Sequence, residues 1–183
     1  MRIARSERPE VKLKVLLTGR PGCGKTTLIR RVVDELALPA GGFYTEEIRQ
    51  RGGRVGFKIV TLAGEEGMLA HVTFNTTQRV GKYGLDLRVL ETIGTEAICT
   101  AVRARQLVVI DEIGPMEIRS PVFCDVVKDV LDSPESSGIL GTITARWFPF
   151  TNAIKKRNDI TLIEVRPNNR DQLALELSGK FKT

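Results

Sequence analysis

The segment Gly19-Arg-Pro-Gly-Cys-Gly-Lys25-Thr26 constrains this chain more than any other feature, because it has the spacing G-x-x-x-x-G-K-[ST]. Its glycines let the backbone turn tightly, so that consecutive N–H groups point inward and form a nest for anionic oxygens. Such a loop needs a strand before it and a helix after it. An apolar run at 12–18 and apolar residues at helical spacing over 26–36 supply both. The segment therefore predicts a phosphate-binding loop.

The residue types in this loop predict how a nucleoside triphosphate and its metal would be held. The helix that begins at about Lys25 adds the positive end of its dipole to the nest. Lys25 is expected to reach the β- and γ-phosphates, and the Thr26 hydroxyl is expected to ligate Mg²⁺. The residues expected to contact the nucleotide are Gly19, Arg20, Pro21, Gly22, Cys23, Gly24, Lys25, Thr26 and Thr27.

Strand-like and helical patterns alternate along the rest of the chain, which predicts an α/β fold. Strands are expected at 12–18, 43–48, 55–62, 68–74, 106–110, 139–144 and 160–165. Helices are expected at 26–36, 86–102, 122–131, 152–157 and 170–177, with Asp86 and Ser120 as N-caps. Right-handed crossovers then imply a P-loop fold with a mostly parallel central sheet and helices on both faces. Glycine turns indicate an antiparallel hairpin excursion at 43–74, followed by a loop at 75–84.

Length and composition favour one globular domain over 12–183, preceded by a basic tail at 1–11 that is expected to be poorly ordered. The chain has 183 residues, of which 42% are apolar and 27% charged. No apolar run is long enough to span a membrane, and no secretory signal precedes the first strand. Three cysteines without a Cys-x-x-Cys pair fit a reducing compartment. We therefore expect a cytoplasmic protein with no membrane partner.

A second buried strand is expected to complete the phosphate site. The run Leu107-Val-Val-Ile110 ends in Asp111 and Glu112. Asp111 is expected to hold Mg²⁺, usually through water, while Glu112 points across the pleat and activates a water molecule against the γ-phosphate. The alternative reading is a pair of solvated acids that cap the next turn.

Several longer blocks resemble one known family. They are 19–27, 42–49, 111–118 with Ser120 and Phe123, 141–143 and 162–171. Together they are similar to the thermophile-type nucleoside-triphosphatase family, which includes the cancer-related nucleoside-triphosphatase. The resemblance runs from about residue 12 to 177. It implies a Mg²⁺-dependent, slow hydrolase of several nucleoside triphosphates on a RecA- or kinase-like P-loop sheet. Phe148 stands where a histidine often precedes the proline in this family, so no role of that histidine carries over.

Two acidic segments and one strand with two threonines are secondary candidates. Glu46 and Glu47 follow an aromatic pair near the carboxyl end of the expected second strand, where either could support Mg²⁺ or the attacking water, or simply pair with neighbouring arginines. Glu117 is interpreted as a loop-fixing contact. Thr142 and Thr144, on the strand after Asp111, could place a hydroxyl near the γ-phosphate, although threonine also favours strands in general.

Basic and amide side chains near the carboxyl end of the chain are further candidates. Arg146, Lys155, Lys156 and Arg157 form a basic cluster. One of them could act as an arginine finger in cis, or the cluster could be a solvated helix face. Asn168, Asn169 and Arg170 precede the last helix and could contact the nucleobase; helix capping would also explain Asn169.

Two other functions remain open at this level. A small nucleotide or metabolite kinase could use the same phosphate site with a hydroxyl acceptor. A nucleotide-gated module could bind nucleic acid through the basic tail and the 155–157 cluster. The pattern predicts nucleoside triphosphates such as ATP and GTP as ligands in each case, and it predicts no oligomeric state.

Overall fold

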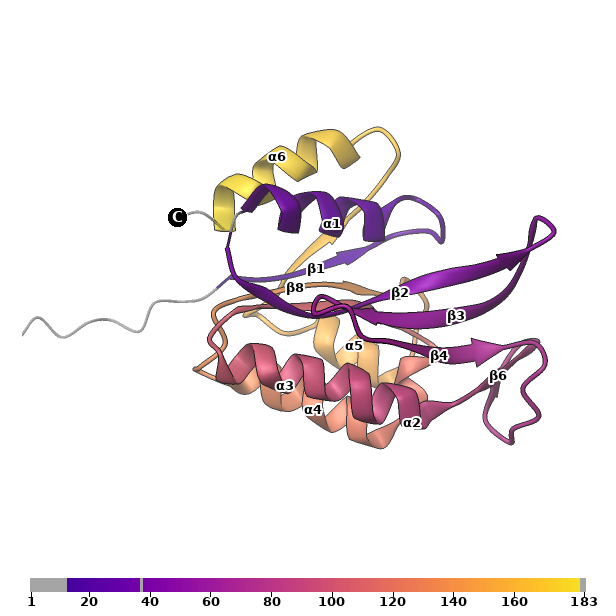
Figure 1. The fold of residues 1–183 in the computed structure, drawn as a ribbon. Coiled ribbons are helices and arrows are strands. Elements are labelled where there is room, and N and C mark those ends of the chain that lie inside the picture. Colours follow the sequence, from indigo (N-terminus) through magenta and orange to yellow (C-terminus); the bar gives the residue numbers. More distant parts are fainter. Residues whose placement is uncertain (1–12, 37, 182–183) are drawn as a thin grey trace, which may run out of the picture.

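The computed structural model describes residues 13–36 and 38–181, so the predicted tail at 1–11 lies outside the described residues. Nine strands form one sheet in the order β5-β6-β4-β3-β2-β7-β8-β1-β9 (Figure 1). The strands are β1 (Lys14–Thr18), β2 (Ala40–Gln50), β3 (Gly53–Thr61), β4 (Glu66–His71), β5 (Arg79–Val80), β6 (Tyr83–Leu85), β7 (Leu107–Ile113), β8 (Ile139–Ile143) and β9 (Thr161–Glu164).

The half of the sheet that contains β1 is parallel, as predicted. Each of the neighbouring pairs β2–β7, β7–β8, β8–β1 and β1–β9 is parallel, so all five carboxyl ends meet at one edge. Strand β8 lies between β1 and β7. The strand that leads into the phosphate loop is therefore separated from the strand of Asp111 by one strand width.

Helices cover both faces of this parallel half (Figure 1). The helices are α1 (Lys25–Leu36), α2 (Leu87–Val89), α3 (Thr95–Arg103), α4 (Pro121–Asp132), α5 (Pro149–Lys155) and α6 (Arg170–Phe181). Val15 and Leu17 point to the face of α1 and α6, whereas Leu16 points to the face of α3 and α4. Burial on both faces is why these strands read as continuous apolar runs.

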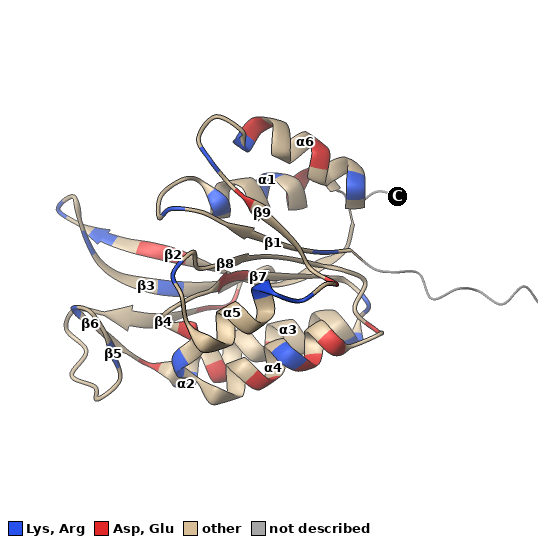
Figure 2. Cartoon of the chain, turned by 180° about the vertical axis from the view of Figure 1, so that it is seen from behind, with Lys and Arg blue, Asp and Glu red and all other residues tan. Residues whose placement is uncertain are grey.

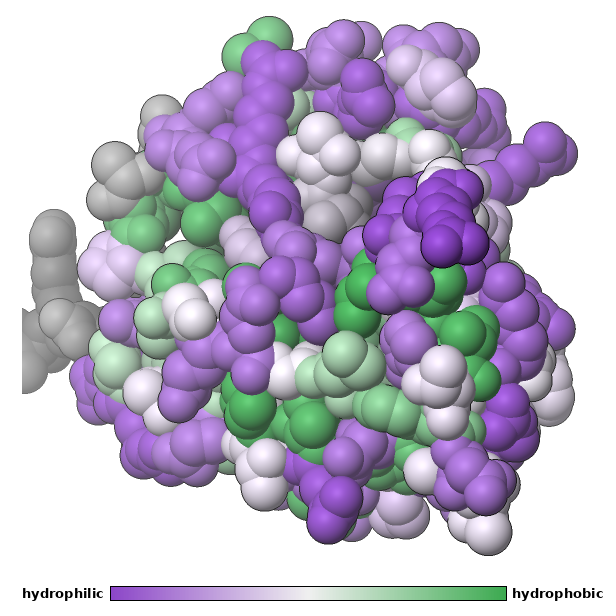
Figure 3. Space-filling view, turned by 45° about the vertical axis from the view of Figure 1, so that its right-hand side comes forward, coloured by the Kyte–Doolittle hydropathy of each residue, from purple (hydrophilic) through white to green (hydrophobic). Residues whose placement is uncertain are grey.

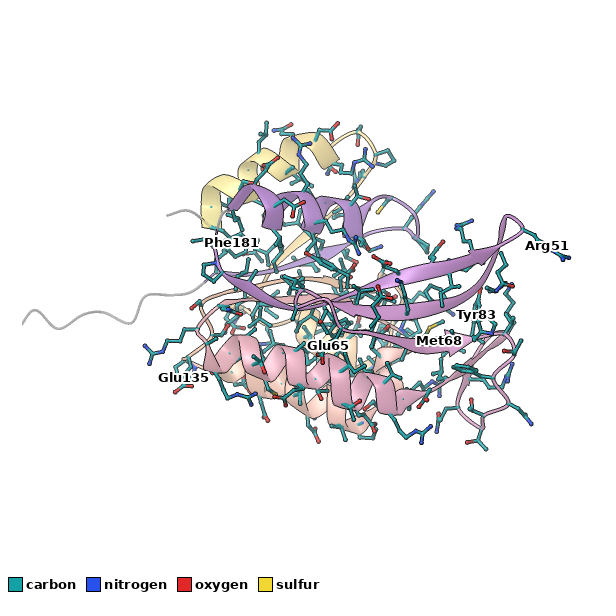
Figure 4. All side chains as sticks on the ribbon, in the orientation of Figure 1. Arg51, Glu65, Met68, Tyr83, Glu135 and Phe181 are labelled. Atoms are coloured by element: carbon teal, nitrogen blue, oxygen red, sulfur yellow. The ribbon has the colours of Figure 1, made fainter. Side chains whose placement is uncertain are left out.

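The other half is an antiparallel wing made by β3, β4, β5 and β6, with the far end of β2 (Figure 1). Arg51, at the tip of the β2–β3 hairpin, points away from the body of the molecule (Figure 4). Segment 75–84, which we expected to be a loop, contains β5 and the start of β6. Gly81, with φ of 58°, makes their tight turn, and the Arg79 guanidinium donates to Phe74 O (2.9 Å) and Lys82 O (2.8 Å). The predicted loop was therefore wrong at this hairpin.

The predicted helix over 86–102 is present but not regular. Asp86 caps α2, since its Oδ1 accepts from Arg88 N at 3.2 Å. A π-helical turn at Leu90–Gly94 then separates α2 from α3. Ser120 caps α4 by accepting from Phe123 N at 3.1 Å, which confirms that cap.

The surface mixes hydrophilic and apolar side chains. On the face drawn in Figure 3, apolar side chains reach the surface in patches between hydrophilic ones. Met68 on β4, whose side chain is seen in Figure 4, is one of the exposed large apolar residues. Among the described residues, no helix has the length and apolar character that crossing a membrane requires.

Candidate functional site

The loop between β1 and α1 has the backbone that a phosphate nest needs. Gly19, Gly22 and Gly24 have φ of 142°, 76° and 93°, which favour glycine. Helix α1 begins at Lys25, so its N-terminal amides face the loop. The Lys25 ammonium folds over this loop and donates to Gly19 O (3.3 Å) and Arg20 O (3.4 Å). Amides and a cation are thus gathered at one concave turn.

Asp111, on β7, presents one carboxylate oxygen without a partner. The residue is 2% exposed. Its Oδ1 accepts a hydrogen bond from Thr142 Oγ1 at 2.5 Å, whereas its Oδ2 is buried with no hydrogen-bond partner among the described residues. Burial raises the pKa of Asp111, and Thr142, Thr26 and then Lys25 act to lower it. A buried oxygen in this state suits a hard cation, and the Thr26 hydroxyl, which acts on the same carboxyl, could supply a second oxygen ligand.

Glu112 follows Asp111 through a cis peptide bond, and its carboxylate folds back over Gly114. A Cβ at Gly114 would lie 2.1 Å from Glu112 Oε1, so only glycine leaves room for this position. Burial raises the pKa of Glu112, while Lys25 lowers it and Asp111 raises it further. Lys25 of the phosphate loop and Asp111 thus lie close enough to Glu112 for their charges to change its pKa.

Glu117 is a functional candidate whose chemistry the sequence reasoning missed. It is 3% exposed in the short 3₁₀ turn Glu117–Arg119. Burial, and then the charge of Glu112, raise the pKa of Glu117 to about 8, although backbone N–H groups, including that of Gly114, lower it. Its carboxyl therefore keeps its proton to a higher pH than an ordinary glutamate does. The Gly114 backbone, against which the Glu112 carboxylate lies, thus also acts on Glu117, which fits the expected loop-fixing contact. The sequence feature that points to Glu117 is its place at the end of the block Asp-Glu-Ile-Gly-Pro-Met-Glu, residues 111–117.

Glu46 and Glu47 point to opposite faces of β2, and each has basic partners. Glu46 pairs with Arg30 of α1 and with Lys58 Nζ at 3.4 Å. Glu47 pairs with Arg54 (2.6 Å) and Arg49 (2.6 Å). These contacts are those of the alternative reading, in which the two glutamates are structural. A role near Mg²⁺ or water stays a prediction.

The structure separates the remaining candidates into two groups. Thr144 and Arg146 lie just beyond the carboxyl end of β8, with Thr144 N bonded to Ile113 O at 3.1 Å, so both are at the edge of the site. Arg157 instead pairs with Asp132 (2.8 Å) and Asp159 (2.8 Å). Asp159 also pairs with Lys14, the first residue of β1, so Arg157 lies at the opposite edge of the sheet and is not brought to the phosphate loop.

Asn169 holds the loop that precedes α6. Its Oδ1 accepts from Arg166 N (2.8 Å), and its Nδ2 donates to Glu164 O (3.0 Å). The side-chain amide is thus occupied by the backbone of its own loop. A contact between Asn169 and a nucleobase stays a prediction.

Comparison with known proteins agrees with this geometry. Residues 14–178 match the model of a family described as NTPase. This chain belongs to that family. Nucleoside-triphosphatase THEP1 of Thermotoga sp. strain RQ2 is 45% identical over 170 residues, which cover 93% of this chain and 96% of the relative. Family membership confirms the resemblance and the prediction of a nucleoside-triphosphatase; these comparisons give no support to the kinase or nucleic-acid-binding alternatives.

Two solved structures have the same fold. The crystal structure of THEP1 from the hyperthermophile Aquifex aeolicus matches with a TM-score of 0.86 and 32% identity, and covers 93% of this chain and 100% of that one. The solution structure of a human cancer-related nucleoside triphosphatase matches with a TM-score of 0.76 and 36% identity, over 92% and 96% of the two chains. The predicted P-loop α/β fold is confirmed. Nucleoside-triphosphate hydrolysis generally requires a divalent cation.

Proposed function

We propose that this protein is a Mg²⁺-dependent phosphohydrolase that converts a nucleoside triphosphate and water into the diphosphate and phosphate, slowly and with several bases. One observation carries the site assignment: the buried, unpartnered Oδ2 of Asp111 lies where Lys25 and Thr26 also act on that carboxyl. This combination of amide nest, ammonium and open carboxylate oxygen suits a polyphosphate with its metal.

Each residue of the site has a defined task in this proposal. The loop amides and Lys25 bind the β- and γ-phosphates, and Thr26 and Asp111 would hold Mg²⁺. The metal, when bound, neutralises charge on the phosphate oxygens. Thr142 donates to Asp111 Oδ1, which would leave Oδ2 available to hold the metal. These groups bind and orient the substrate before any bond changes.

Glu112 serves as the base in the chemical step. The water oxygen forms a bond to the γ-phosphorus as the bond from phosphorus to the β,γ-bridging oxygen breaks, and the water proton passes to Glu112. The diphosphate leaves with the electron pair of the broken bond. The raised pKa of Glu117 favours its neutral form and so limits the negative charge beside this base.

The test is phosphate release from ATP, GTP, CTP and UTP, with Mg²⁺ and with the metal chelated. We expect turnover with all four, a requirement for the cation, and loss of at least about 100-fold in Lys25→Ala. Lys128→Ala is the matched control, because Lys128 is exposed on α4, where it pairs with Asp125 and lies over the Phe150 ring. Metal-independent turnover, or an unchanged Lys25→Ala variant, would contradict the proposal.

A cytoplasmic location is part of the same proposal. The three cysteines, Cys23, Cys99 and Cys124, are all free thiols, as expected in a reducing compartment. Fractionation of cells that express the full chain tests this directly.

A further inference from the structure

The segment after β9 lies along the phosphate loop and contacts both of its ends. A Cβ at Gly19 would lie 2.6 Å from Val165 O. A Cβ at Gly24 would lie 2.7 Å from Arg170 Nη1 and 2.9 Å from Arg170 Cδ. Figures 1 and 2 both show the β9–α6 connection beside the β1–α1 connection. The Arg170 side chain therefore rests directly on the loop that binds phosphate.

Arg170 has no strong partner that would explain its position. The described contacts give it one distant ion pair, to its neighbour Asp171 at 4.0 Å, and 41% of its side chain is exposed. A cation at the first residue of a helix is also unfavourable with respect to the helix dipole. The turn fixed by Asn169 nevertheless presents Arg170 at this place. Helix stability alone thus gives no reason for an arginine here.

The strand order decides which end of the nucleotide Arg170 would meet. The catalytic candidates of β7 lie on one flank of β1, beyond β8, and β9 lies on the other flank. Because hydrolysis occurs beside Glu112, the γ-phosphate occupies the β7 flank. The nucleoside must then extend toward β9 and α6. Arg170 is consequently at the nucleoside end, and too far round the loop to act as an arginine finger.

We propose that the Arg170 guanidinium is the stacking surface for the nucleobase, and that it lets this site accept different bases. This inference rests on the proposed function. Neither 18–27 nor 164–171 contains an aromatic residue, so a guanidinium is the group with a broad flat face that these segments offer. Of their three arginines, Arg166 pairs with Glu164, and Arg170 is the one whose side chain lies against Gly24 of the loop. An arginine plane stacks on the face of any base, and it reads none of the base edges that distinguish one base from another.

The experiment is calorimetric binding of ADP, GDP, CDP and UDP, with inorganic pyrophosphate as the ligand that lacks a nucleoside. Arg170→Ala should weaken each nucleoside diphosphate about 10-fold and leave pyrophosphate within about 2-fold. Arg170→Lys should weaken them nearly as much, because lysine keeps the charge and the aliphatic stem but lacks the plane. Arg166→Ala is the matched control, because Arg166 lies in the same segment but pairs with Glu164. This variant should bind every ligand as the wild type does.

Three results would overturn the inference. If Arg170→Ala weakens pyrophosphate as much as the nucleoside diphosphates, Arg170 contacts phosphate and not the base. If the affinity for every ligand is unchanged, Arg170 contacts no part of the nucleotide. If the affinity falls for one base only, Arg170 does not explain the acceptance of different bases. Thermal unfolding of each variant checks that the fold is intact, and Arg170→Lys keeps the test decisive if Arg170→Ala unfolds. Because binding is measured without turnover, these results are independent of whether the wild type hydrolyses nucleotides.

Discussion

The pKa of the glutamates is raised beside the parallel half of the sheet and lowered in the antiparallel wing. Beside the parallel half, Glu117 is buried and Glu112 is half-buried, and the loss of solvent around them raises the pKa of both. In the wing, hydrogen bonds from Arg30 lower the pKa of Glu46; burial raises that of Glu47, but Arg54 and Arg49 lower it overall. The difference shows that environment separates carboxyls suited to proton transfer from carboxyls held permanently charged in ion pairs.

The largest effect on catalysis is expected from a substitution that moves the Glu112 carboxylate away from Gly114. In Gly114→Ala, the new methyl group would displace the Glu112 carboxylate, so kcat should fall about 100-fold. KM should change little, since the phosphate loop is untouched. Steady-state phosphate release measures both. Gly179→Ala, where a Cβ meets nothing within 4 Å, is the control and should keep the wild-type kcat. A normal kcat in Gly114→Ala would show that the position of Glu112 is not critical.

Asp111, in the parallel half of the sheet, is tested by the affinity of its variants for Mg²⁺. Asp111→Asn should weaken the apparent affinity for Mg²⁺ at least about 10-fold, and Thr142→Val should weaken it less, because it removes only the hydrogen bond to Oδ1. Binding of Mn²⁺ in the presence of ADP, followed by electron paramagnetic resonance, gives a readout apart from turnover. Asp125→Asn, an exposed acid paired with Lys128, is the control. Equal metal affinity in all three variants would remove Asp111 from the metal site.

Glu117 predicts a pH effect on stability. Its pKa of about 8 in the folded state exceeds the ordinary glutamate value of 4.5, so the folded state holds a proton that the unfolded state releases. Stability from this group is therefore full below about pH 4.5 and is lost as the pH rises toward 8. Urea unfolding of Glu117→Gln should show a smaller loss between these limits than the wild type. Glu96→Gln, at an exposed site, should keep the wild-type slope, and an identical slope in Glu117→Gln would refute the assignment.

Of these substitutions, one in the wing should have the smallest effect on the protein. Glu47→Gln removes ion pairs to Arg49 and Arg54 that are largely exposed, so its unfolding free energy should fall by less than about 1 kcal/mol. The loss should shrink further at high salt, because salt screens exposed charges. Denaturant unfolding at low and high salt measures it. A loss that is larger and independent of salt would mean that the wing carboxylates are not ordinary surface pairs.

Local patterns predicted the parts of the site that lie close together in the chain. The phosphate loop between a strand and a helix, and Asp111-Glu112 at a buried strand, depend on short spacing and apolar runs. The raised pKa of Glu117 and the contact of Arg170 with Gly24 arise only when distant segments fold together. The hairpin at 79–85 was missed because its strands are two and three residues long, too short for an alternating pattern.

The central claim is that Glu112, half-buried beside the phosphate loop, transfers the proton, whereas Glu47, the same residue type in the wing, does not. Glu112→Gln and Glu47→Gln are compared by two measurements on each sample, the Kd for MgATP and the rate of phosphate release in a single turnover. We predict that Glu112→Gln binds MgATP within about 3-fold of the wild type but hydrolyses it at least about 100-fold more slowly, while Glu47→Gln matches the wild type in both. Wild-type phosphate release by Glu112→Gln would contradict the account.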